Sequence, residues 1–211
     1  MTYKEILNTL NPEVWRNLSE EEKMDYFQSL ENCMAMENNR DSCKVNGKFL
    51  YTGKEGVVLG AYNPETREID INVSQFDECS LYGREPGRLT QTCLHEGRHA
   101  LQHQVAEGAV NYPDSKAAEE WKHNLEEGNY ISYKRNPKAY YNQPVERDAR
   151  EFAATRYKTL LAEKANMEIS RDDSVGIKEA AKVFSNQMES DQNLAADYQS
   201  IGNREHAGQR M

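Results

Sequence analysis

Five consecutive residues have the types and the spacing of a metal site: His95-Glu96-Gly97-Arg98-His99. On a helix, two histidines four residues apart lie about 40° apart around the axis and one turn apart along it. Both imidazoles can therefore reach one ion, at Zn–N distances of about 2.0–2.1 Å. Glu96 projects from the same side, close enough to take a proton from a metal-bound water. The spacing predicts a zinc site with His95 and His99 as ligands and Glu96 as the catalytic base.

The residues around this motif also follow a helical pattern, which predicts a helix over residues 88–105. With a step of about 100° per residue, small and apolar side chains fall in one sector: Leu89, Cys93, Gly97, Ala100, Leu101 and Val105. Polar side chains fall in the opposite sector: Thr92, His95, Glu96, His99, Gln102 and His103. This separation favours an active-site helix beside a cleft over two solvated surface histidines.

A catalytic zinc site needs three protein ligands and an open position. His103 is the nearest additional histidine, but its backbone is expected about 12 Å along the helix axis from His95. One ion is not easily shared across that distance, so a supporting or surface role is expected for His103. The H-x-x-G-x-x-H continuation of metzincins is also absent.

Residues 142–153 begin with the pattern N-x-P-x-E-x-x-A, in which Glu146 is the acid and Ala149 the small residue. Together with the H-E-x-x-H helix, this segment resembles zincin metallopeptidases of the gluzincin kind, in which a later helix supplies a glutamate ligand. The wider stretch, roughly residues 15–160, resembles poorly characterised zincin domains of bacterial mobile-element and toxin-type proteins. The resemblance implies that Glu146 is the third zinc ligand and that Ala149 lets the two helices approach closely.

Other side chains remain alternatives or weaker candidates. Asp148 and Glu151 are rival ligands, and Glu146 could instead be an ordinary acid of a first helical turn. A tyrosine hydroxyl near the zinc could stabilise an oxyanion, as in the resembling peptidases. Four tyrosines lie in the segment directly before the Glu146 helix, and of these we rank Tyr140 and Tyr141 above Tyr130 and Tyr133. The arginines Arg98 and Arg150 could orient carboxylates near the site, but we favour positions at the surface for both.

The element pattern predicts an α+β fold, zincin-like, with a small, mostly antiparallel sheet packed on the motif helix. Residues 1–38 are expected to be helical, with one helix capped by Ser19. Strands are expected in the β-prone runs 48–51, 57–62 and 68–72. Further helices are expected over residues 115–127, 144–165 and 176–188. Residues 1–165 would form a zincin-like metallopeptidase domain, and residues 166–211 a C-terminal helix and a polar, flexible tail.

Composition excludes several function classes. The net charge is −9 and no basic stripe interrupts the acidic average, which argues against a nucleic-acid partner. No apolar run approaches the roughly 20 residues that span a bilayer, and the N-terminus lacks a signal-peptide pattern. The chain is therefore expected in the cytoplasm, or exported by a signal-independent route. Four cysteines without CxxC spacing do not predict a disulfide framework.

The sequence thus predicts a zinc-dependent metallopeptidase, an endopeptidase rather than an exopeptidase, with a protein or peptide substrate and narrow specificity. An inhibitor or a delivery partner would fit a protease that must not act broadly. Two alternatives remain: a zinc hydrolase of a non-peptide amide or ester, and a catalytically silent binding module with the zincin fold. Glu96 disfavours the silent module, because this residue serves catalysis and not metal affinity.

Overall fold

A computed structural model of the chain describes residues 1–50, 52–53, 56–77 and 85–169. The chain divides into two compact units, Met1–Lys164 and Ala165–Met211. Of the second unit only residues 165–169 are described, and they are helical. The helix expected over 176–188, the expected flexible tail and Cys79 lie outside the described residues. Among the described helices, none is both long enough and apolar enough to cross a membrane.

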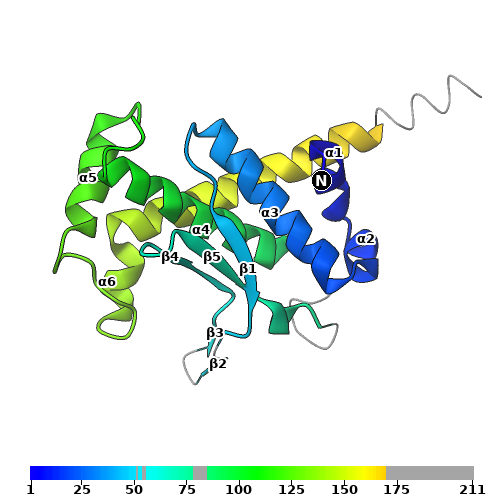
Figure 1. The fold of residues 1–211 in the computed structure, drawn as a ribbon, viewed down its shortest axis with the longest axis horizontal. Coiled ribbons are helices and arrows are strands. Elements are labelled where there is room, and N and C mark those ends of the chain that lie inside the picture. Colours follow the sequence, from blue (N-terminus) through cyan, green and yellow to red (C-terminus); the bar gives the residue numbers. More distant parts are fainter. Residues whose placement is uncertain (51, 54–55, 78–84, 170–211) are drawn as a thin grey trace, which may run out of the picture. The chain divides into compact units, whose positions relative to one another are not determined.

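The N-terminal residues are helical, as predicted, and they form three helices: α1 (Tyr3–Thr9), α2 (Pro12–Asn17) and α3 (Glu20–Glu37) (Figure 1). Ser19 caps α3 through a capping box. Its hydroxyl accepts from the Glu22 amide at 3.2 Å, and the Glu22 carboxylate accepts from the Ser19 amide at 2.7 Å. Two backbone donors of the first turn are satisfied in this way, so the start of α3 is determined locally by the sequence.

An aromatic cluster joins α2 and α3 to the segment after the sheet. Trp15, Tyr26, Phe27 and Phe76 are all buried. Their ring centroids are 5.1–5.9 Å apart, and most pairs meet edge to face. Aromatic pairs in this geometry contribute about 0.5–1.5 kcal/mol each beyond the burial of their surface. The cluster therefore fixes the N-terminal helices against the rest of the first unit.

The sheet is small and mixed. Its three strands are β1 (Lys44–Lys48), β4 (Gly60–Asn63) and β5 (Glu68–Asn72), in the order β1-β5-β4. The pairing of β1 with β5 is parallel and that of β4 with β5 is antiparallel. A separate antiparallel pair joins β2 (Thr52–Gly53) to β3 (Gly56–Val57). The α+β class is confirmed, but the three-stranded sheet is mixed and not mostly antiparallel.

The difference arises at β1, which lies before the run predicted over residues 48–51. Only Val45 is buried in β1, and it pairs with the buried Ile69 of β5. The other residues of β1 are polar or glycine, so neither alternation nor β-propensity marks this strand in the sequence. The strand nevertheless forms, because β5 offers it a complete parallel ladder and α3 packs against it.

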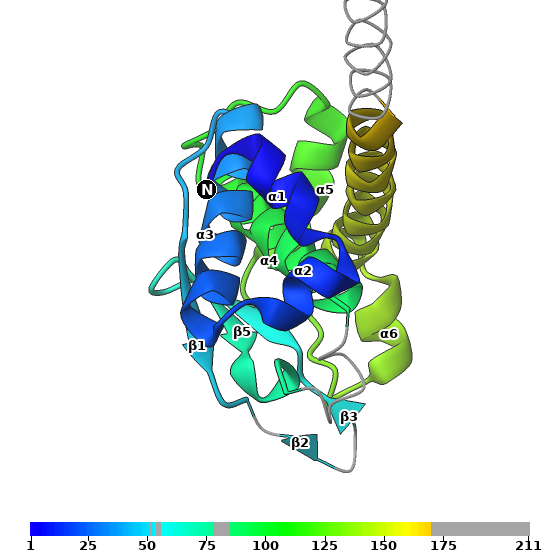
Figure 2. The same ribbon diagram turned by 90° about the vertical axis from the view of Figure 1, so that its right-hand side faces the viewer.

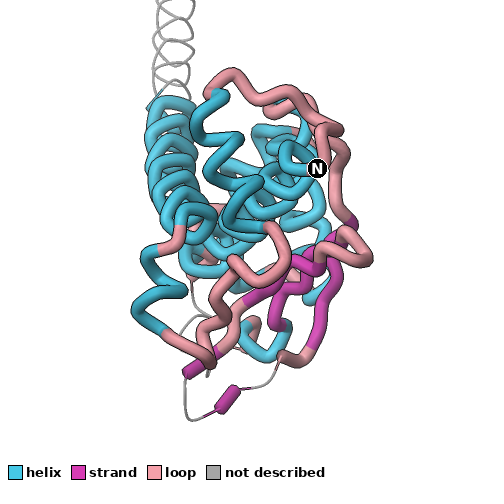
Figure 3. Tube along the Cα trace, turned by 90° about the vertical axis from the view of Figure 1, so that its left-hand side faces the viewer, coloured by secondary structure: helices cyan, strands magenta, loops and turns pink. Residues whose placement is uncertain are grey.

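The motif helix α4 (Gly87–Ala106) lies at the centre of the first unit and contacts α3, β4, β5 and α5 (Ser115–Leu125). The short helix α6 (Pro137–Asn142) was not predicted. It precedes a helix over residues 144–164, which was predicted. Figure 2 shows α4 between α3 and this last helix. Figure 3 shows the strands gathered to one side of the helices. The motif thus has a helix on each side and the sheet against it.

Two glycines allow this close packing around α4. A Cβ atom on Gly60 would lie 2.7 Å from Thr92 Cγ2 and 2.8 Å from the Asp70 carbonyl oxygen. A Cβ atom on Gly97, in the middle of the motif, would lie 2.8 Å from Glu31 Oε2 of α3. Glycine inside a helix costs about 1 kcal/mol relative to alanine. Here that cost is offset by the approach of α3 to the motif.

Candidate metal centre

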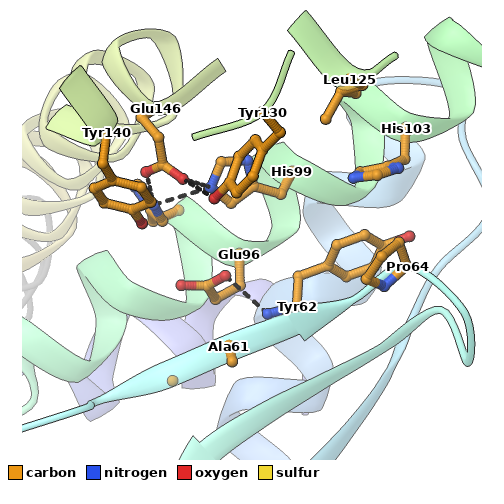
Figure 4. Close-up of a pocket in the computed structure, with 12 residues that line it drawn as sticks. Ala61, Tyr62, Pro64, Glu96, His99, His103, Leu125, Tyr130, Tyr140 and Glu146 are labelled. Atoms are coloured by element: carbon orange, nitrogen blue, oxygen red, sulfur yellow. Dashed lines mark hydrogen bonds and ion pairs between the residues drawn. The ribbon is translucent and has the colours of Figure 1, made fainter. Parts of the chain in front are cut away.

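Two elements bring three potential metal ligands together. His95 and His99 project from α4, and Glu146 comes from the first turn of the helix over residues 144–164. Figure 4 shows His99 and Glu146 close to each other. The two Nε2 atoms are 3.1 Å apart. Carboxylate oxygens of Glu146 lie 3.4 Å from His95 Nε2 and 3.5 Å from His99 Nε2. One ligand atom from each residue lies within 4.8 Å of the others, so this group could hold a metal ion.

Hydrogen bonds behind His99 determine which of its ring nitrogens faces this group. The Gln102 amide nitrogen donates to the Val145 carbonyl at 3.0 Å and to Asp148 Oδ2 at 2.7 Å. Its amide oxygen must then be the atom that faces His99 Nδ1, at 2.8 Å. Because that oxygen can only accept, Nδ1 carries the hydrogen and the neutral ring presents its Nε2 lone pair to the cluster. A metal ligand needs this tautomer.

Arg98 is buried and holds Asp148, the acceptor of the Gln102 amide, in place. Its guanidinium donates to both oxygens of Asp148, at 2.8 and 3.0 Å, and to the Tyr112 hydroxyl at 2.9 Å. It also lies over the rings of Tyr112, Trp121 and Phe152, 4.7–5.3 Å from their centroids. The surface position expected for Arg98 is therefore wrong: the residue is 7% exposed. A planar cation among three rings can be buried because Asp148 pairs with it.

We expect Gln102→Met to weaken zinc binding by about 10- to 100-fold, the usual effect of removing a hydrogen-bond partner of a metal-binding histidine. Methionine keeps the length of the side chain but removes the acceptor for His99 Nδ1–H. Competition with a chromophoric chelator measures the change in affinity. Gln91→Met, on the same helix α4, is the matched control and is expected to bind zinc as the parent does. An unchanged affinity in Gln102→Met would contradict the role of this hydrogen bond.

The charges in this group shift the pKa values of its members in opposite directions. Burial raises the pKa of Glu146, but hydrogen bonds from His95 and His99 outweigh burial and hold the pKa of this carboxyl far below its usual range. Burial lowers the pKa of His99, yet its hydrogen bond to Glu146 and the charge of Glu96 leave that pKa above its ordinary value. Glu146 is therefore ionised, and protons compete with a cation at His99.

This competition predicts a pH dependence of zinc affinity. Zinc needs the neutral imidazole, so binding must displace the proton that His99 holds below its raised pKa. Affinity should be greatest above that pKa and fall as the pH decreases through it, beginning above the ordinary histidine value of about 6.5. Chelator competition across this range measures the effect. A constant affinity down to the ordinary histidine range would contradict the prediction.

Glu96 lies beside the ligands and is bound to the edge of the sheet. Its Oε2 accepts a hydrogen bond from the Tyr62 amide of β4 at 2.9 Å. The odd-numbered residues of this segment face β5, as the hydrogen bond from the Asn72 amide to the Leu59 carbonyl shows. The backbone groups of Gly60 and Tyr62 therefore face away from β5. Glu96 is thus held between the ligand group and the open edge of β4.

A cavity of about 420 Å³ opens at this point, as Figure 4 shows. His95, His99, Glu96 and Glu146 contribute to its wall, and its remaining lining residues are Gly60, Ala61, Tyr62, Pro64, His103, Leu125, Tyr130 and Tyr140. Every candidate ligand and the candidate base therefore face one space. His103 lies in the wall with its ring packed on that of Tyr62, at 5.4 Å between centroids, and is not among the converging ligand atoms.

The structure brings one of the two first-ranked tyrosines to the cavity. Tyr140 lines it, whereas Tyr141 is 57% exposed and lies under the guanidinium of Arg150. Consecutive residues of a helix point about 100° apart, so α6 cannot turn both side chains to one space. Tyr130, which we ranked lower, also lines the cavity, and its hydroxyl donates to Glu146 Oε1 at 2.9 Å. Its position in a loop gave no periodic signal.

The rival ligands lie elsewhere. Asp148 is engaged by Arg98 and Gln102, and Glu151 is exposed to solvent. Comparison of the chain with protein-family models, with curated proteins and with solved structures found no match in any of the three.

Proposed function

We propose that the chain is a zinc-dependent metallopeptidase of the zincin class, with His95, His99 and Glu146 as the zinc ligands. The separations of their ligand atoms carry this proposal. A tetrahedral zinc ion with ligands at about 2.0–2.1 Å requires neighbouring ligand atoms about 3.3–3.4 Å apart. His95 Nε2 and His99 Nε2 are 3.1 Å apart, and each lies close to a different oxygen of Glu146: Oε2 is 3.4 Å from His95 Nε2 and Oε1 is 3.5 Å from His99 Nε2. One ligand atom from each of the three residues lies within 4.8 Å of the others. The donor set also fits zinc chemically, since three acceptors facing one another need a cation or protons among them.

When bound, zinc would lower the pKa of a water molecule and polarise the scissile carbonyl. Glu96 accepts the proton of the attacking water and returns it to the leaving amine. The Tyr62 amide positions the carboxylate for both transfers. A glutamate at this position adds little to metal affinity, so its presence between the ligands and the open strand edge favours an enzyme over a silent binding module.

Tyr130 and Tyr140 supply hydrogen-bond donors on the other side of the ligands. Burial, together with the charge of Glu146, raises the pKa of both phenols well above the ordinary value. Both hydroxyls therefore remain protonated across the physiological range, and a phenol proton in this place can stabilise a developing oxyanion. Tyr130 donates its one proton to Glu146 Oε1, so it would have to exchange this acceptor for the oxyanion. Tyr141 is not included in this role, because its side chain lies outside the cavity wall.

The open edge of β4 supports a peptide as the substrate. In the described part of the sheet β4 is an edge strand. Gly60 presents its backbone amide and carbonyl along this edge and Tyr62 its carbonyl, since the Tyr62 amide is bound to Glu96. An extended peptide can add to such an edge through main-chain hydrogen bonds, while its side chains enter neighbouring pockets. This arrangement would place a peptide bond against Glu96. It favours a peptide over a small amide or ester, which would not need the strand.

A peptide pool tests this proposal directly. The purified, zinc-loaded full chain is incubated with peptides from a digested proteome, and new termini are identified by mass spectrometry. We expect cleavage at a restricted set of sequences, its loss with a chelator, and its recovery on addition of zinc. Casein, a generic protease substrate, should be degraded poorly, since we propose a narrow substrate range. An absence of cleavage by the zinc-loaded protein would overturn the metallopeptidase proposal.

A further inference from the structure

A second cavity, of about 340 Å³, shares His95 and Glu96 with the first but has a different wall. Its other lining residues are Leu59, Arg88, Gln91, Thr92, Arg150 and Ala153. The two cavities therefore lie on either side of the candidate base. Leu59 comes just before β4 and Pro64 just after it, so the second cavity lies at the beginning of this strand and the first extends to its end.

The two cavities differ in charge. The described residues that line the first cavity are rich in aromatic and apolar side chains and include neither lysine nor arginine. The wall of the second carries two guanidinium groups, Arg88 and Arg150, in a chain whose net charge is −9. Among the described residues that line the second cavity, Glu96, the candidate base, is the one that carries a carboxylate. An apolar or aromatic group suits the first cavity, and an anion suits the second.

Arg150 is held in place before any ligand arrives. Its guanidinium donates to the Tyr141 carbonyl and stacks on the Tyr141 ring, 3.5 Å from the centroid. Arginine offers five N–H donors in a planar fork that matches a carboxylate. Tyr141 already restricts the conformations of the Arg150 side chain. The entropy cost of fixing this side chain when a carboxylate binds is therefore smaller. Arg88 approaches the same cavity from the first turn of α4.

The direction of β4 relates this cavity to one side of the scissile bond. Antiparallel pairing is slightly more stable per residue than parallel pairing, so we expect a peptide to run opposite to β4. Such a peptide passes the first cavity before the second. The residue in the second cavity then lies on the C-terminal side of the bond that faces Glu96.

We propose that the second cavity is a carboxylate subsite, in which Arg88 and Arg150 select a substrate with an anionic group directly after the scissile bond. The placement relative to that bond rests on the proposed peptidase function; the recognition of a carboxylate rests on the cavity alone. The carboxylate can belong to a glutamate or aspartate side chain or to the C-terminus of the peptide. Both sources present the same chemistry to the two guanidinium groups.

Binding is measured first, so that turnover is not required. The probe is a short peptide, blocked at both ends, with phenylalanine followed by glutamate at its centre; the matched probe has glutamine in place of glutamate. A third peptide has alanine in place of the glutamate and ends at this alanine with a free C-terminal carboxylate. A fourth peptide has the same sequence but ends in a C-terminal amide. Affinities are measured with zinc-loaded Glu96→Gln, Glu96→Gln/Arg150→Gln and Glu96→Gln/Arg88→Gln. Arg147→Gln in the Glu96→Gln background is the control, because Arg147 is exposed on the helix of Arg150 and lines neither cavity.

A hydrogen-bonded charge of this kind corresponds to about a 10- to 100-fold preference for the carboxylate. We expect this preference in the Glu96→Gln protein and in its Arg147→Gln control, and its reduction to a few-fold or less in both double variants. Preference for glutamate over glutamine identifies a side-chain carboxylate as the ligand. Preference for the free acid over the amide identifies the chain terminus. Equal affinities within both pairs, or a preference that survives both arginine substitutions, would overturn the subsite.

Cleavage by the parent protein then separates the two proposals. We expect the bond before the glutamate to be cut, with a higher kcat/KM than in the glutamine peptide. Cleavage after the glutamate would overturn the placement of the subsite. If no peptide is cut but the arginine-dependent binding preference is found, the peptidase proposal fails and the carboxylate site stands. If cleavage occurs without any preference for the carboxylate, the subsite fails and the peptidase proposal stands.

Discussion

Replacing Glu96 by glutamine is expected to lower kcat by about 10²- to 10⁴-fold while zinc remains bound, because general acid–base catalysis contributes a factor of this size. Glutamine keeps the shape of the side chain, and its amide oxygen can still accept from the Tyr62 amide. It cannot take up the proton of the attacking water. The ligands His95, His99 and Glu146 are untouched, so metal content should match that of the parent. Steady-state kinetics on a cleaved peptide and elemental analysis measure the two quantities together.

Glu119→Gln is the matched control for this substitution. Glu119 is an exposed acid on α5 that does not line either cavity, and its loss changes the net charge of the chain by the same amount. We expect its kcat to equal that of the parent. Glu96→Gln activity within a few-fold of the parent would show that another group acts as the base. Loss of zinc from Glu96→Gln would instead assign Glu96 to metal binding.

Arg40→Met is expected to destabilise the fold by about 3–5 kcal/mol, the cost of leaving a buried charge without its partner. The Arg40 guanidinium binds both oxygens of Glu31, at 2.6 and 2.7 Å, and both side chains are 1% exposed. Glu31 also accepts from the Cys43 amide at 2.9 Å and faces Gly97 of the motif. Without Arg40, the Glu31 carboxylate would be an unpaired buried charge next to Gly97, in the middle of the motif. Chemical denaturation measures the loss in the free energy of unfolding.

Two further variants distinguish this pair from an ordinary ion pair. Lys48→Met removes the cation from an ion pair with Asp70, at 2.8 Å, in which Lys48 is exposed, and should leave the free energy of unfolding nearly unchanged, because exposed ion pairs contribute little. The double variant Glu31→Met/Arg40→Met removes both buried charges and should be more stable than Arg40→Met alone, since no charge is left unpaired. A double variant less stable than Arg40→Met would mean that the packing, and not the unpaired charge, determines the loss.

Most helices of the first unit, though not α6, could be predicted because their signals are local. Ser19 and Glu22 form the expected capping box, and the apolar and polar sectors of α4 follow from a spacing of 3.6 residues. Proline at position 144 marked the start of the last helix in the same way. The strand β1 could not be predicted, because it is polar and forms only through its partner β5.

For the candidate site as well, the residues that follow a local pattern could be predicted, and those that depend on packing between helices could not. The spacing of His95, Glu96 and His99 on one helix face can be derived from the sequence, whereas the position of Glu146 depended on a resemblance. Its approach to the histidines depends on how two helices pack, and no local pattern encodes that. The buried position of Arg98 was missed for this reason: its partner Asp148 is 50 residues away. Tyr130 could be found only once its loop was placed beside Glu146.

The most direct test of the central claim is the metal content of the purified full chain and of its His95→Ala and Glu146→Ala variants. The proposed ligand set predicts about one zinc ion per chain in the parent, as in a mononuclear site. It predicts loss of that zinc in both variants, with their helical circular dichroism retained. Zinc retained in Glu146→Ala would place the third ligand on another residue. A parent protein that binds no zinc, even after reconstitution, would contradict the account.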